Sequence, residues 1–185
     1  MENQTEPQVI PDAPARRQPL IDQMHQLAEN GNHCGGCSGV CCTFLANSML
    51  ITPVEALDLK TWLQSQDRWN DDLIIRLKDC IKKFRLDQDL GDGRRSFRRT
   101  YTCPFYRNGP QGCSISRHHK PYGCLAFNAR SPGLTEGGDC ASDQESLKTL
   151  ESEAEASHNQ FLKLKHQWLF EKAPIPVALL SIIEG

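Results

Sequence analysis

The spacing of apolar residues along the chain predicts a mainly helical protein. Apolar positions between Leu20 and Leu27 recur at the three- and four-residue intervals of an amphipathic helix, and Gly31 would end that helix. The preceding segment, residues 1–17, holds three prolines among mostly polar neighbours, which predicts a flexible leader. We therefore expect a single domain over residues 18–185.

Two further helices have clear start signals. Thr52 and Glu55 are the two ends of a capping box with Pro53 in the first turn, so a helix should begin there and continue to about residue 65. The pattern predicts another helix over residues 71–86, with apolar side chains along one face. Cys80 lies on that face, and we assign it to the core as a small apolar residue rather than to a metal site.

The rest of the chain has weaker patterns. Residues 96–106 have the alternation of a short strand, and residues 112–116 could pair with it. Residues 128–143 should be irregular. A long helix is expected over residues 144–172, with a last short helix near the end of the chain. The inner stripe of the long helix should consist of Leu147, Leu150, Ala154, Phe161, Leu164 and Trp168. The predicted fold class is mainly α, with helices packed around irregular cysteine-rich loops and at most a small β-hairpin.

Composition narrows the classes of partner. The 185 residues carry a formal net charge of −2, so the overall field favours neither nucleic acid nor a membrane surface. The first residues lack the apolar segment of a secretory signal, and the longest apolar run, residues 177–183, is too short to span a bilayer. We expect a cytoplasmic protein with neither membrane nor nucleic acid as its partner, and we leave a protein partner open.

The cysteines carry most of the chemical information. In a reducing compartment, clustered cysteines are more often metal ligands or redox groups than disulfides. With Cys80 assigned to the core, eight of the nine cysteines remain, in two groups. The candidate metal ligands are Cys34, Cys37, Cys41, Cys42, Cys103, Cys113, Cys124 and Cys140.

A centre that joins both groups is energetically reasonable. The groups are roughly 60 residues apart, and closing such a loop costs about 3–4 kcal/mol in chain entropy. Structural zinc sites contribute about 10–16 kcal/mol at neutral pH, which exceeds that cost. Cys41 and Cys42 are adjacent and should point in different directions, so they serve two centres or one of them is not a ligand. Zinc and iron–sulfur clusters both accept four thiolates, so the sequence leaves the metal and the number of centres open.

This arrangement resembles the YkgJ-type cysteine-cluster family, described as a zinc- or iron-chelating domain, over about residues 30–130. The chain departs from the family pattern at Lys120, where arginine usually precedes the proline, and at Leu125, where a basic residue often follows the cysteine. The resemblance implies metal binding, and the best-understood relatives are flagellin lysine N-methylases. It rests on Cys34-x2-Cys37-x3-Cys41-Cys42, the helix start Thr52 to Glu55, Cys103-Pro-Phe, Cys113 and Lys120-Pro-x-x-Cys124.

Basic residues gather near the second cysteine group. They could form a solvated face, compensate the negative charge of a thiolate-bound cluster, or bind an anionic partner such as RNA. The histidines nearby, His33, His118 and His119, should be exposed or hydrogen-bonded to metal ligands. No pattern identifies catalytic residues. The basic residues are Arg94, Arg95, Arg98, Arg99, Arg107, Arg117 and Lys120.

The expected function is therefore metal binding, through an iron–sulfur cluster or zinc held by clustered cysteines. Two alternatives remain open at this point. One is an enzyme that modifies a protein substrate, as a lysine N-methylase does. The other is a zinc-dependent module that binds RNA or protein.

Overall fold

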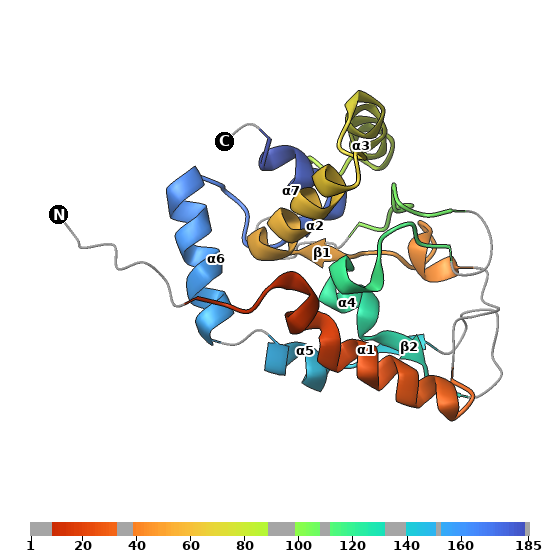
Figure 1. Cartoon of the computed structure of the whole chain (residues 1–185). Coiled ribbons are helices and arrows are strands. Elements are labelled where there is room, and N and C mark those ends of the chain that lie inside the picture. Colours follow the sequence, from red (N-terminus) through yellow and green to blue (C-terminus); the bar gives the residue numbers. More distant parts are fainter. Residues whose placement is uncertain are drawn as a thin grey trace, which may run out of the picture.

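The computed structural model describes residues 9–32, 39–88, 99–107, 112–131, 140–150 and 153–183. Within these ranges helices dominate, so the predicted mainly α fold class is confirmed (Figure 1). Short 3-10 turns occur at Val40–Cys42 and Arg117–His119. The α-helices are α1 (Ala13–Glu29), α2 (Pro53–Ser65), α3 (Asp71–Phe84), α4 (Tyr122–Leu125), α5 (Gln144–Leu150), α6 (Glu153–His166) and α7 (Ile175–Ser181).

The first helix begins earlier than its apolar pattern indicated. Asp12 caps α1 by accepting a hydrogen bond from the backbone N–H of Ala15 at 2.9 Å, so the helix starts at Ala13, inside the expected flexible leader. Arg17 is fully buried, together with Leu20, on the face of α1 that meets the rest of the protein. The expectation of a flexible segment up to residue 17 is wrong at its end, because a cap and buried contacts outweigh composition.

The two helices with strong start signals form as predicted. Thr52 and Glu55 make the complete capping box of α2, with Pro53 in its first turn. Asn70 caps α3 by accepting from the N–H of Leu73 at 3.1 Å. Leu59 of α2 has no exposed surface, and α2 contributes most of its apolar side chains to the main core that it shares with α3 and α7.

The strands are short and join distant parts of the chain. β1 (Leu50–Ile51) pairs antiparallel with β4 (Ala173–Pro174), and β2 (Phe127–Ala129) pairs antiparallel with β3 (Cys140–Ser142). Residues 128–143 are therefore not irregular throughout. Of the expected hairpin between residues 96–106 and 112–116, the described residues retain one antiparallel bridge, between Tyr106 and Cys113.

The C-terminal part differs from the single long helix that was expected. α5 ends at Leu150 and α6 begins at Glu153, while residues 151 and 152 lie outside the described residues. α6 then ends at His166, before Gln167, whose φ of 55° is left-handed. Leu164, expected on the inner stripe, is 57 % exposed, whereas Leu162 is buried in the core. The predicted last helix is present as α7. No helix in the described part of the chain is long and apolar enough to cross a membrane.

Candidate functional site

The two cysteine groups meet in the fold. The 3-10 turn at Val40–Cys42 follows Gly39, whose φ of 75° suits glycine. The backbone N–H of Cys103 then donates to the carbonyl oxygen of Cys42 at 2.8 Å. Two residues earlier in the chain, the N–H of Tyr101 donates to the carbonyl of Asn47 at 2.9 Å. Segments roughly 60 residues apart in sequence are therefore held side by side by backbone hydrogen bonds.

A buried tyrosine holds this junction to the core. Tyr101 has no exposed surface, and its hydroxyl donates to the carbonyl of Met49 at 2.7 Å. The same hydroxyl accepts from the N–H of Ile175 at 3.1 Å, and Asn47 donates its side-chain amide to the carbonyl of Tyr101. Tyr101 is therefore part of the core.

Three thiols of the second group lie within electrostatic range of one another. Burial, with a smaller contribution from the neighbouring thiol of Cys113, raises the pKa of Cys103 to about 12. Burial also raises the pKa of Cys124, with Cys103 and Cys113 as the next contributors. Cys113 is brought here because Ser114 donates its N–H to the carbonyl of Phe105 at 2.9 Å. Cys124 comes from the short helix α4.

Lys120 is the common cationic neighbour of both groups. Its ammonium lowers the pKa of Cys103 and of Cys124, against the larger effect of burial. The same ammonium also acts to lower the pKa of Cys41. That pKa is nevertheless raised, chiefly by a hydrogen bond to the thiol of Cys42 and then by burial. A single positive charge thus faces thiols from both cysteine groups, where it would stabilise their deprotonated forms.

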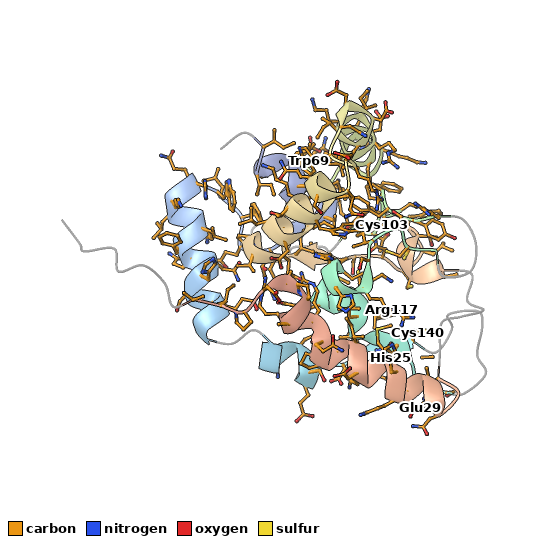
Figure 2. All side chains as sticks on the ribbon, in the orientation of Figure 1. His25, Glu29, Trp69, Cys103, Arg117 and Cys140 are labelled. Carbon is orange, nitrogen blue, oxygen red and sulfur yellow. The ribbon has the colours of Figure 1, made fainter. Side chains whose placement is uncertain are left out.

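The structure brings together five of the eight predicted ligands and describes one other, Cys140, away from Cys103. Cys34 and Cys37 lie outside the described residues. Cys140, at the start of β3, lies in a different part of the protein from Cys103 (Figure 2). The five thiols that share this region are Cys41, Cys42, Cys103, Cys113 and Cys124.

Cys80 also lies near these thiols. It is 8 % exposed, as expected for a core residue, and its thiol donates to the carbonyl of Thr102 at 3.4 Å. It nevertheless raises the pKa of Cys103, so it is within electrostatic range of the group from which we excluded it. Neither Cys80 nor the five gathered thiols form a disulfide bond.

The donor chemistry of this region suits a soft metal. Thiolates are the preferred ligands of zinc and of iron–sulfur clusters, and the nearby lysine offsets their negative charge. Among the described residues, however, no three His, Cys, Asp or Glu side chains form a group with metal-binding geometry. The Cys-x2-Cys pair that would complete such a group lies outside the described residues.

The basic residues and histidines take several roles. Arg99 donates to the carbonyls of Phe84 and Arg85, and Arg107 and Arg117 are exposed. His118 is exposed as expected, but His119 stacks on Trp62 with their ring centres 5.4 Å apart. His119 therefore has a packing role that its sequence context did not indicate. Arg94, Arg95, Arg98 and His33 lie outside the described residues.

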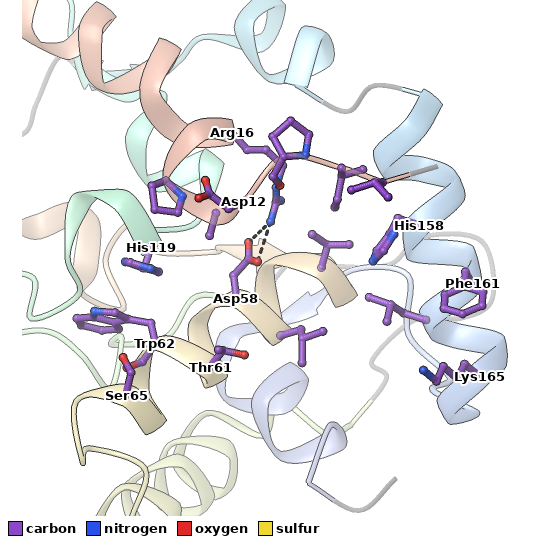
Figure 3. A pocket seen from close by; sticks show the side chains of 18 residues that line it. Asp12, Arg16, Asp58, Thr61, Trp62, Ser65, His119, His158, Phe161 and Lys165 are labelled. Atoms are coloured by element: carbon purple, nitrogen blue, oxygen red, sulfur yellow. Dashed lines mark hydrogen bonds and ion pairs between the residues drawn. The ribbon is translucent and has the colours of Figure 1, made fainter. Parts of the chain in front are cut away.

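A second candidate site lies between α1, α2 and α6 (Figure 3). It is an open cavity of about 680 Å³ whose walls are mostly apolar, with His119 and His158 among the polar residues that line it. Burial lowers the pKa of both histidines, which favours their neutral forms. No sequence motif marks this cavity, because its walls come mainly from three helices far apart in the chain.

A buried charge network forms one wall of that cavity. Arg16 donates to both carboxylate oxygens of Asp58 at 2.7 Å and to the hydroxyl of Tyr122 (Figure 3 draws the Asp58 contacts). Arg17 reaches Asp58 at 2.9 Å. Burial raises the pKa of Glu155, which lies 3.6 Å from Arg16, to about 7. The only sequence signal for this network was the Arg16–Arg17 pair inside a segment expected to be flexible.

The network is connected to the cysteine region. Arg17 donates its Nε hydrogen to the carbonyl oxygen of Lys120 at 2.7 Å, and its guanidinium lies 4.8 Å from the ring centre of Tyr122. Glu55 accepts from the backbone N–H of Tyr122 at 2.8 Å. Helices α1 and α2 therefore fix the segment that carries Lys120 and Cys124.

Comparison with known proteins adds no relative. No family model, no curated protein and no solved structure matches this chain.

Proposed function

We propose that this protein is a cytoplasmic metal-binding protein that holds an iron–sulfur cluster or zinc through clustered cysteines. The observation that carries the proposal is the meeting of the two cysteine groups, where Cys103 donates to the backbone of Cys42 and both groups face Lys120. Neutral thiols that only packed in the core would not be stabilised by a nearby positive charge, whereas metal-binding thiolates would. The proposed ligand set also includes Cys34, Cys37, Cys113 and Cys124, and the YkgJ-type resemblance points the same way. Cys140 would belong to a second centre, because it lies away from Cys103.

The protonation of the thiols is consistent with this role. Burial keeps Cys103 and Cys124 as neutral thiols in the absence of metal, since it raises both pKa values. A metal ion binds the thiolate forms, so binding would release protons to solvent. Bound metal would supply electron transfer if it is an iron–sulfur cluster, or a rigid cross-link between the two segments if it is zinc.

The test compares two buried cysteines with different assignments. Metal content and an absorption spectrum are measured on protein purified without oxygen, for wild type, Cys124→Ser and the control Cys80→Ser. We expect Cys124→Ser to lose most of the metal and Cys80→Ser to keep it, because serine is a poor ligand for soft metals. Brown protein with acid-labile sulfide would identify the cluster, and colourless protein with stoichiometric zinc would identify zinc. Equal metal loss in both variants would overturn the ligand assignment, and metal-free wild type would overturn the function.

One observation favours an alternative function as an enzyme. The cavity of about 680 Å³ has several neighbours with shifted pKa values, a combination that is common in active sites. A lysine N-methylase-like enzyme would bind a methyl donor, so S-adenosylmethionine should raise the melting temperature. No shift at millimolar donor would count against this alternative. The zinc-dependent RNA or protein module remains a third proposal, for which salt-dependent RNA retention is the test.

A further inference from the structure

A second group of charged residues lies around Arg68, at the start of α3. Arg68 and Arg76 line an open cavity of about 500 Å³, together with Asn70, Asp72 and Ile75. Arg76 is exposed, and so is Arg107, which belongs to the segment that carries Cys113. Two arginines therefore border this accessible hollow, and Arg107, from a second chain segment, lies within electrostatic range of Arg68.

Arg68 is held rigidly by two kinds of contact. Its two terminal nitrogens donate to the carbonyl and to the hydroxyl of Ser114, at 2.8 and 2.9 Å. Its guanidinium also lies 5.1 Å from the ring centre of Trp62. These hydrogen bonds occupy two of the five N–H groups of an arginine, so the fixed side chain keeps further donors. They also tie the loop before α3 to the segment around Ser114.

The positive charges at this place repel one another. Burial lowers the pKa of Arg68, and the next largest causes are the positive charges of Arg107 and Arg76. Among the described residues, no carboxylate lies within 4.0 Å of any of these three guanidinium groups, Asp72 included. Like charges gathered without a counter-ion raise the free energy of the protein, and a bound anion would lower it.

We propose that Arg68, Arg76 and Arg107 bind a phosphate-type oxyanion, either free phosphate or the phosphate group of a nucleoside monophosphate. Arginine suits this ligand because its planar guanidinium can donate two parallel hydrogen bonds to phosphate oxygens. The cavity is larger than a single phosphate requires, and Ile75, which is 55 % exposed, offers an apolar surface beside it. The inference does not rest on the proposed metal centre.

The structure supplies a fluorescence readout. Trp62 contacts Arg68, and Trp69 directly follows Arg68 in the chain. An anion bound at Arg68 should therefore change the tryptophan emission. Sodium phosphate is titrated into the full-length protein against sodium chloride at the same ionic strength. We expect a saturable change with phosphate alone. The same change with chloride would mean general screening and would overturn the proposal.

Two exposed arginines provide the test variants. Arg76→Gln combined with Arg107→Gln should weaken phosphate binding about tenfold or more, because each substitution removes a charge-assisted contact. Arg130→Gln, an exposed arginine on another segment, should leave it unchanged. Far-UV circular dichroism verifies that the variants are folded. Unchanged phosphate affinity in the folded double variant would overturn the proposal.

A last comparison distinguishes the source of the phosphate. AMP is titrated beside phosphate and adenosine. Tighter binding of AMP than of phosphate indicates a nucleotide site, equal binding indicates a phosphate site, and both support the proposal. Adenosine binding as tightly as AMP would show that the phosphate group is not recognised, which would refute it. Because metal content is measured separately, failure here leaves the cysteine centre untouched.

Discussion

Removing the Asp58 carboxylate tests the buried charge network directly. Asp58 contacts Arg16 at 2.7 Å and Arg17 at 2.9 Å, and the side chains of these arginines are 8 % and 0 % exposed. Arg16 would retain Glu155 at 3.6 Å after the change Asp58→Ala. Arg17 would keep no carboxylate within 4.0 Å among the described residues, so only the more distant Glu55 would offset its buried charge.

The expected cost follows from that orphaned charge. Breaking a buried ion pair by removing one partner costs about 3–5 kcal/mol. In a chain of this size each kcal/mol lowers the melting temperature by about 2–4 °C, which predicts a loss of roughly 6–20 °C. Urea unfolding followed by circular dichroism measures the free energy directly. The control is Asp79→Ala on the exposed face of α3, which should change the stability by less than about 0.5 kcal/mol.

A second substitution separates charge from packing. Arg17→Met removes the orphaned charge and keeps most of the side-chain volume, so in the Asp58→Ala background it should recover part of the lost stability. The loss of stability in the double variant should then be smaller than the sum of the losses in the two single variants. If the two costs add to within about 0.5 kcal/mol, or if Asp58→Ala costs less than about 1 kcal/mol, the ion pair does not stabilise α1 as we argue.

Two further predictions concern other buried polar groups. Glu155 has a pKa of about 7 against an ordinary 4.5, so the folded state holds the proton more tightly and stability should fall as pH rises through that range. Glu155→Gln should remove this fall, worth about 3 kcal/mol at most between pH 4.5 and 8; parallel stability profiles for the two proteins would contradict it. Tyr101→Phe leaves the carbonyl of Met49 and the N–H of Ile175 without their buried partner and should cost about 2–4 kcal/mol in urea unfolding. A cost below about 0.5 kcal/mol would show that water or a shifted backbone replaces the hydroxyl.

Local signals in the sequence predicted some elements well. The capping box at Thr52 and Glu55 fixed the start of α2 to the residue, because a cap is made within one turn of chain. The start of α1 was missed because composition suggested flexibility, whereas Asp12 caps the helix and Arg17 is buried against Asp58. Leu164 was wrongly assigned to the inner face of α6. The prediction extended one apolar stripe along a single long helix, whereas the structure has two helices, α5 and α6.

The candidate sites divide in the same way. The spacing of the cysteines predicted which thiols could bind a metal, and five of these thiols lie together in the fold. Cys140, however, lies in another part of the protein from Cys103. No spacing rule could indicate that Cys80 would approach Cys103, because that contact depends on how α3 packs. The cavity beside Arg16 had no sequence signal, since its walls come from segments distant along the chain. The hollow beside Arg68 is lined by one short stretch, residues 68–76, but no motif marked it.

The sequence alone determined the helical class, the N-terminal capping box of α2 and the set of thiols available to a metal. These depend on residue type and on spacing within a few turns of chain. The tertiary structure decided which thiols share a neighbourhood, which cation lies near them and which arginines lie close together. Those properties depend on contacts between residues far apart in sequence, and on burial, which sets the cost of each unpaired charge.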